Sequence, residues 1–76
     1  MTITGAQVKS ARLLLGWSQE KLAAEVRVSQ STIGYFETGG RRPPSALIVS
    51  AIQRALEKAG VEFVDGEPGV ELKGKP

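Results

Sequence analysis

The apolar residues of the chain recur at helical spacing in four stretches, each bounded by residues that start or stop helices. We expect helices over residues 5–15, 19–25, 30–37 and 46–59. The first three share a start signature, in which an apolar residue precedes a Thr or Ser cap and a second apolar residue follows the cap four positions on. The triples are Ile3–Thr4–Val8, Trp17–Ser18–Leu22 and Val28–Ser29–Ile33. Three such matches predict short helices with tight starts.

The apolar stripes of these helices predict a single core. Its expected members are Val8, Ala11, Leu14, Leu15, Trp17, Leu22, Ala23, Val26, Ile33, Phe36, Leu47, Ile48, Ala51, Ile52, Ala55 and Leu56. Glycine and proline pairs in residues 38–44 predict a loop before the fourth helix.

After Gly60 the pattern changes from helical spacing to alternation. Residues 61–64 and 69–72 read as two short strands, with turn residues between them. A lone hairpin is marginally stable in water, so it needs a surface to pack on. We therefore expect a mainly α chain, with a helical domain over residues 1–60 and a β tail over residues 61–76 that serves in dimerisation.

Composition narrows the possible chemistry. The 76 residues suffice for one domain with a modest core. The sequence has no Cys, no His and a single Asp, which argues against an enzyme and leaves neither a metal site nor a cofactor to expect. The apolar runs are too short to span a membrane, and the N-terminus does not read as a signal peptide, so we expect a cytoplasmic protein.

The net charge of +2 hides an uneven distribution. Residues 1–58 carry eight basic and four acidic side chains, whereas residues 59–76 carry two basic and four acidic ones. A basic body with an acidic tail indicates that the body meets a polyanion.

The second and third predicted helices are separated by only about three residues, 26–28. Two short helices with so tight a joint form a helix-turn-helix, whose second helix can lie in the major groove of DNA. Gly34 stands inside that second helix, where it costs stability. It is either neutral drift or a place where DNA or a neighbouring element approaches closely.

The combined pattern resembles the Xre-type regulators, relatives of the phage Cro and cI repressors, over roughly residues 4–60. The matching residues are Arg12, then 18–23, 28–33 and 37–43, and a fourth helix with Ile52 and 55–57. One departure is Arg27, which stands where the family usually has glycine in the turn. A positive φ there would cost a residue with a Cβ about 1 kcal/mol.

The resemblance implies a set of site residues. The residues expected to contact bases are Gln30, Ser31, Thr32 and Tyr35. The residues expected to contact phosphates are Gln19, Ser29, Arg41 and Arg42. Arg12 and Glu37 would form a structural ion pair. Two alternatives remain open: Thr32 could bond a helix carbonyl instead, and Arg41 and Arg42 could be a solvated charge pair.

The sequence thus predicts a homodimeric, sequence-specific transcriptional regulator that binds a near-palindromic operator in double-stranded DNA. It would act as a repressor or as an activator. The two chains would meet through their tails or their fourth helices. The alternative from another class is a protein-interaction module, such as an antitoxin or an adaptor whose acidic tail docks a partner.

Overall fold

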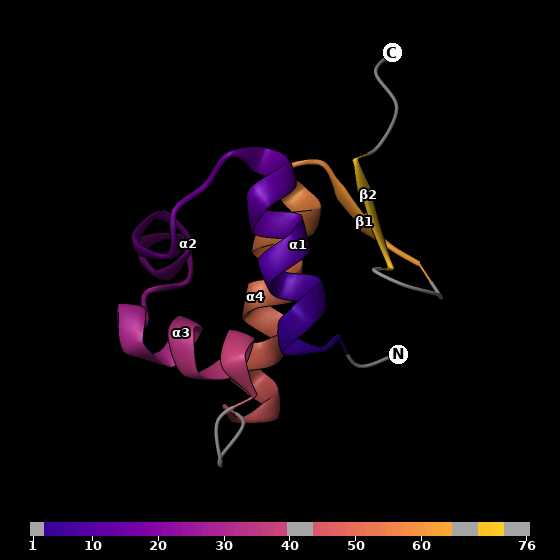
Figure 1. Ribbon diagram of the computed structural model, residues 1–76. Helices are drawn as coiled ribbons and strands as arrows, with labels where there is room; N and C mark the ends of the chain where they lie inside the picture. Colours follow the sequence, from indigo (N-terminus) through magenta and orange to yellow (C-terminus); the bar gives the residue numbers. More distant parts are fainter. Residues whose placement is uncertain (1–2, 40–43, 65–68, 73–76) are drawn as a thin grey trace.

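The computed structural model describes residues 3–39, 44–64 and 69–72. Within them the chain forms four helices and an antiparallel hairpin (Figure 1). The elements are α1 (Gly5–Leu15), α2 (Gln19–Val26), α3 (Gln30–Thr38), α4 (Ala46–Lys58), β1 (Val61–Phe63) and β2 (Val70–Leu72). This confirms the predicted fold class, with most element ends within one residue of expectation. Thr38, which we expected in the loop, is the last residue of α3.

Side-chain caps explain where the helices begin. Thr4, Ser18, Ser29 and Ser45 each accept a hydrogen bond from the backbone N–H three residues on. At α1 the bond is reciprocal, because the Gln7 side chain also accepts from the Thr4 N–H at 2.9 Å. Gly16 and Gly39 end α1 and α3 in the left-handed conformation, as expected of glycine after a helix.

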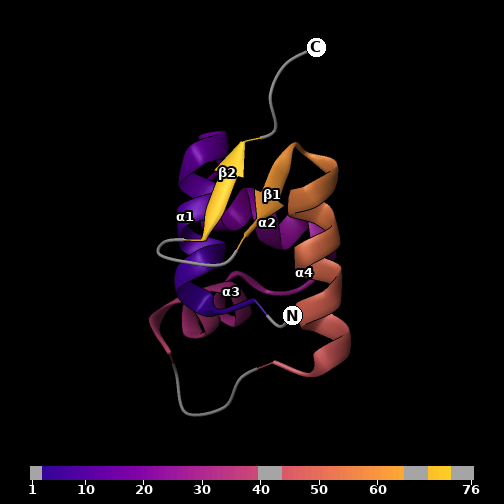
Figure 2. The same ribbon diagram turned by 90° about the vertical axis from the view of Figure 1, so that its right-hand side faces the viewer.

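The elements stack in three layers (Figures 1 and 2). Helices α1 and α4 form the middle layer, with the hairpin across one face and α2 and α3 on the other. Strand β2 lies next to α1 and strand β1 next to α4. The hairpin therefore sits on the opposite side of the middle layer from the helix-turn-helix pair.

The core draws on every layer. Its buried apolar residues are Ile3, Val8, Ala11, Leu22, Ala23, Ile33, Phe36, Ile52, Leu56, Val61 and Val70. Trp17, expected in the core, is half-buried and packs against it. Val61 and Val70 come from the hairpin, so the tail packs on the helices of its own chain and is not left without a surface.

Two of the expected core residues are exposed, and their prediction was wrong. Leu14 is 45% exposed and Leu47 is 78% exposed. Successive residues turn by about 100° around a helix, so Leu14 falls well away from the face that buries Val8 and Arg12. Leu47 likewise falls on the side of α4 opposite the buried Ile52.

The hairpin has a fixed register. Val61 pairs with Leu72, Glu62 with Glu71, and Phe63 with Val70. Alternation puts Val61, Phe63 and Val70 on the face toward the helices, where Leu72 at the end of β2 stays 48% exposed, and it leaves both glutamates exposed side by side. The Gln7 side chain donates to the Gly69 carbonyl at 3.2 Å, which ties the start of β2 to the first turn of α1. Of the described helices, the longest has 13 residues, too few to cross a bilayer.

Candidate nucleic-acid interface

A three-residue turn, Arg27, Val28 and Ser29, joins α2 to α3. Arg27 adopts the left-handed conformation, with φ 59° and ψ 45°, although it carries a Cβ. The Val28 N–H donates to the Ala23 carbonyl at 3.0 Å, which closes the end of α2. The turn thus has the left-handed conformation that glycine favours, here adopted by an arginine.

A buried ion pair fixes the end of α3 against α1. Arg12 Nε donates to Glu37 Oε2 at 2.8 Å, and Arg12 Nη2 donates to Glu37 Oε1 at 3.0 Å. A third donor, Arg12 Nη1, bonds the Trp17 carbonyl at 2.9 Å. The hydrogen bonds that Arg12 donates to Glu37 raise the pKa of Arg12 above its ordinary value, against the opposing effect of burial. Arg12 therefore stays charged, and its fork holds α3, α1 and the start of α2 together.

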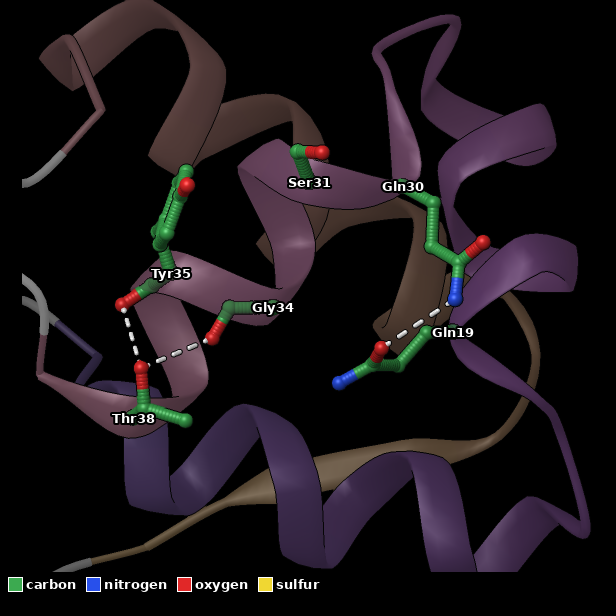
Figure 3. Close-up of a pocket in the computed structure, with 6 residues that line it drawn as sticks. All are labelled: Gln19, Gln30, Ser31, Gly34, Tyr35 and Thr38. Carbon is green, nitrogen blue, oxygen red and sulfur yellow. Dashed lines mark hydrogen bonds between the residues drawn. The ribbon is translucent and has the colours of Figure 1, made fainter.

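The ion pair continues outward through two glutamines. Gln19 Nε2 donates to Glu37 Oε1 at 3.1 Å. Gln30 Nε2 in turn lies 3.4 Å from Gln19 Oε1, a long hydrogen bond (Figure 3). A chain of side chains thus links buried Glu37 to exposed Gln30, the first residue of α3.

A shallow hollow of about 430 Å³ lies on the outer side of α3 (Figure 3). We call it the α3 hollow. It is lined by Gln19, Gln30, Ser31, Gly34, Tyr35 and Thr38. Four of the six are site residues predicted from the sequence. Tyr35 is 66% exposed and stands at one side of the hollow, with Gln30 across from it.

The other predicted site residues lie elsewhere. Ser29 caps α3, and its hydroxyl lies 3.0 Å from that of Thr32, so these two side chains engage each other at the helix start. Thr32 does not take the helix-carbonyl bond that was the alternative for it. Arg41 and Arg42 lie outside the described residues.

Sequence reasoning left Thr38 out of the site and left Gly34 undecided. The Thr38 hydroxyl lies 3.1 Å from the Gly34 carbonyl and 3.3 Å from the Tyr35 carbonyl, to which it donates. The spacing of the residues could have placed both at the site. Gln30, Gly34 and Thr38 follow one another at intervals of four, and residues at that spacing share one face of a helix.

These features define the class of protein: two short helices with a tight turn, and a second helix that presents polar side chains outward. A family model described as Helix-turn-helix matches residues 8–63. The chain therefore belongs to the Cro/C1-type, Xre-like helix-turn-helix family, a family of DNA-binding transcriptional regulators. No curated protein sequence matches the chain significantly.

Proposed function

We propose that this protein is a sequence-specific transcriptional regulator that binds a near-palindromic operator in double-stranded DNA as a homodimer. The observation that carries the proposal is the exposed row of Gln30, Ser31 and Tyr35 along α3. An α-helix fits the major groove, where each base pair presents a distinct pattern of donors and acceptors. The role is one of binding and not of catalysis, and it would be carried out in the cytoplasm.

Gln30 is the side chain best prepared to read a base. One N–H of its amide points to Gln19 Oε1, which leaves the other N–H and the carbonyl oxygen for adenine N7 and N6. Ser31 and Tyr35 lie beside it on the same surface and would read neighbouring bases. Thr32 would reach the groove wall from the first turn of α3.

The remaining predicted residues would hold the protein on the DNA backbone. Gln19 stands at the first position of α2 and Ser29 at the cap of α3, where helix N-termini favour phosphate. Arg41 and Arg42 would neutralise phosphates directly. These contacts carry most of the affinity and make it fall steeply with salt.

A homodimer would place two copies of α3 about 34–36 Å apart, one helical turn of DNA. The contact is expected at the tail or at α4, and each carries an exposed leucine: Leu72 is 48% exposed on β2, and Leu47 is 78% exposed in the first turn of α4. Sedimentation of the variants Leu47→Ser and Leu72→Ser would identify which surface makes the contact. A wild-type protein that binds its operator as a monomer would contradict the proposal.

The experiment that tests the function is selection of bound duplexes from a random pool, followed by binding assays on the consensus. Gln30→Ala should lose preference at one base position, at a cost of about 1–3 kcal/mol. Arg41→Ala should weaken binding to all sequences alike and flatten the salt dependence. Lys58→Ala is the charge-matched control, because Lys58 ends α4 at the end far from α3 (Figure 1).

The proposal fails if selection returns no consensus, or if Gln30→Ala lowers binding to every sequence by the same factor. Recovery of one stoichiometric protein from cell extract, with no retardation of DNA, would instead favour the protein-interaction module.

A further inference from the structure

Gly34 lies at the centre of the α3 hollow, between Gln19 and Tyr35 (Figure 3). It is in the middle of a nine-residue helix, where alanine would be more stable. A Cβ built on Gly34 would meet only the Gln19 side chain, at 3.7 Å from Oε1 and 3.8 Å from Nε2. These are ordinary van der Waals distances, so the packing of this chain leaves room for alanine.

Gly5 shows what a glycine required by packing looks like. A Cβ on Gly5 would lie 1.8 Å from the Phe36 carbonyl oxygen and 2.7 Å from its carbon. At Gly5 the backbone of α3 approaches too closely for any side chain. At Gly34 the corresponding space lies in the hollow and is open to whatever approaches α3 from outside.

The floor of the hollow around Gly34 offers carbon, whereas Gln30 and Ser31 bring polar groups to its edges (Figure 3). The Gln19 amide donates to Glu37 and accepts from Gln30, and the Thr38 hydroxyl donates to two carbonyls of its own helix. The carbon groups that face the hollow around Gly34 are the Gly34 Cα, the Thr38 methyl group and the Tyr35 ring (Figure 3). Such a surface favours an apolar group over a hydrogen-bonding one.

We propose that the α3 hollow receives the 5-methyl group of a thymine, and that Gly34 determines specificity by leaving space for it. The inference rests on the proposed function, since it requires α3 to lie in the major groove. There the 5-methyl group of thymine is the apolar feature that the base pairs present, among donors and acceptors. The neighbouring Gln30 would read the adjacent base pair.

The test uses the consensus duplex selected by the wild-type protein. Each thymine is replaced in turn by deoxyuridine, which removes only the methyl group. At one thymine per half-site the wild-type affinity should fall about fourfold, the value of one buried methyl group. Gly34→Ala puts its own methyl group where the thymine methyl would contact the floor, so it should bind the thymine duplex more weakly and lose little or nothing further with deoxyuridine.

Two further arms make the readout specific. A cytosine–guanine pair at that position should bind weakly, and 5-methylcytosine should recover part of the loss for wild type but not for Gly34→Ala. Ser50→Ala is the matched control, because Ser50 is exposed on α4 and does not line the hollow, and it should respond to deoxyuridine as wild type does. Thermal unfolding of Gly34→Ala should show a Tm at least as high as that of wild type, so weaker binding is not misfolding.

The outcomes distinguish failure of the proposed function from failure of the inference about the hollow. If the wild type selects no consensus, the proposed function fails. If the wild type binds its consensus specifically but no thymine distinguishes it from Gly34→Ala, the function stands and the inference about the hollow is wrong.

Discussion

Arg12 of α1 and Glu37 of α3 face each other through two parallel hydrogen bonds of 2.8 and 3.0 Å. Their side chains are 10% and 2% exposed, so the pair lies at the edge of the core. Glu37 also accepts from Gln19, which leads to Gln30 at the surface. The pair therefore orients the surface that we propose reads DNA.

Loss of one partner should cost far more than loss of a surface pair. Arg12→Ala leaves the Glu37 carboxylate buried and uncompensated, which should lower the free energy of unfolding by about 3–5 kcal/mol. Lys21→Ala breaks the exposed pair with Glu25, whose side chains are 50% and 44% exposed, and should cost at most about 0.5 kcal/mol. Urea unfolding at neutral pH measures both.

If the alanine variant does not fold, Arg12→Lys can be measured instead, because lysine keeps the positive charge but cannot make the two parallel hydrogen bonds of the guanidinium. Its loss in the free energy of unfolding should lie between those of Arg12→Ala and Lys21→Ala. Since the pKa of Arg12 is raised, the contribution of its charge to stability is fully present at neutral pH and is lost on the alkaline side only in strong alkali. Equal small costs for Arg12→Ala and Lys21→Ala would contradict the structural role.

The turn between α2 and α3 offers a stabilising substitution. Arg27 has φ 59°, so Arg27→Gly should raise the free energy of unfolding by about 1 kcal/mol. The reciprocal change is Gly16→Ala: Gly16 has φ 71°, and a Cβ there would meet nothing within 4 Å, so the conformation alone should cost about 1 kcal/mol. Thermal or urea unfolding should show opposite signs; the same sign for both would contradict the conformational argument.

The sequence predicted the helices well because their signals are local. Caps such as Thr4 and Ser18 lie within three residues of the groups they bond, and apolar periodicity sets the buried faces. Leu14 and Leu47 were misplaced because a stripe of leucines does not reveal which side another element covers. Burial of the hairpin on its own chain could not be predicted either, because it depends on how α1 and α4 pack side by side to form the surface that the strands cover.

The candidate site was predicted only in part. Motif resemblance gave Gln30, Ser31 and Tyr35, which do lie together on α3. It did not give the bonds of the Gln19 amide to Glu37 and Gln30, because hydrogen bonds between helices depend on distances that local patterns do not encode. The α3 hollow could not be predicted for the same reason, because its lining combines Gln19 of α2 with residues of α3.

The two glycines compared above should respond oppositely to alanine. Gly5→Ala would drive a methyl group into the Phe36 carbonyl and should destabilise the fold by about 1–3 kcal/mol or more. Gly34→Ala gains helix propensity in an open space and should stabilise the fold by about 0.5–1 kcal/mol. Unfolding midpoints of the two variants decide the matter; a destabilised Gly34→Ala would mean that the chain itself needs this glycine.

The hairpin should contribute to stability through one face only. Val61 is fully buried, and Val61→Ala should lower the free energy of unfolding by about 2 kcal/mol. Glu62 is exposed and lies directly opposite Glu71, so Glu62→Lys replaces a repulsion with an attraction and should gain about 0.2–1 kcal/mol. If Val61→Ala unfolds at the same urea concentration as wild type, the tail does not pack on the helices as described.

The hydrogen bond between Gln19 and Gln30 predicts that the two residues act as a unit in DNA recognition. Gln19→Ala removes the acceptor that orients the Gln30 amide, so it should reduce preference at the same base position as Gln30→Ala. In a double-mutant cycle on the selected consensus, the second substitution should then cost less than it does alone, with a coupling of at least about 0.5 kcal/mol. Gln53→Ala is the matched control, because Gln53 donates to Glu57 at 3.0 Å within α4 and should be additive with Gln30→Ala. Strict additivity of Gln19→Ala and Gln30→Ala would mean that Gln19 serves the phosphate backbone independently of Gln30.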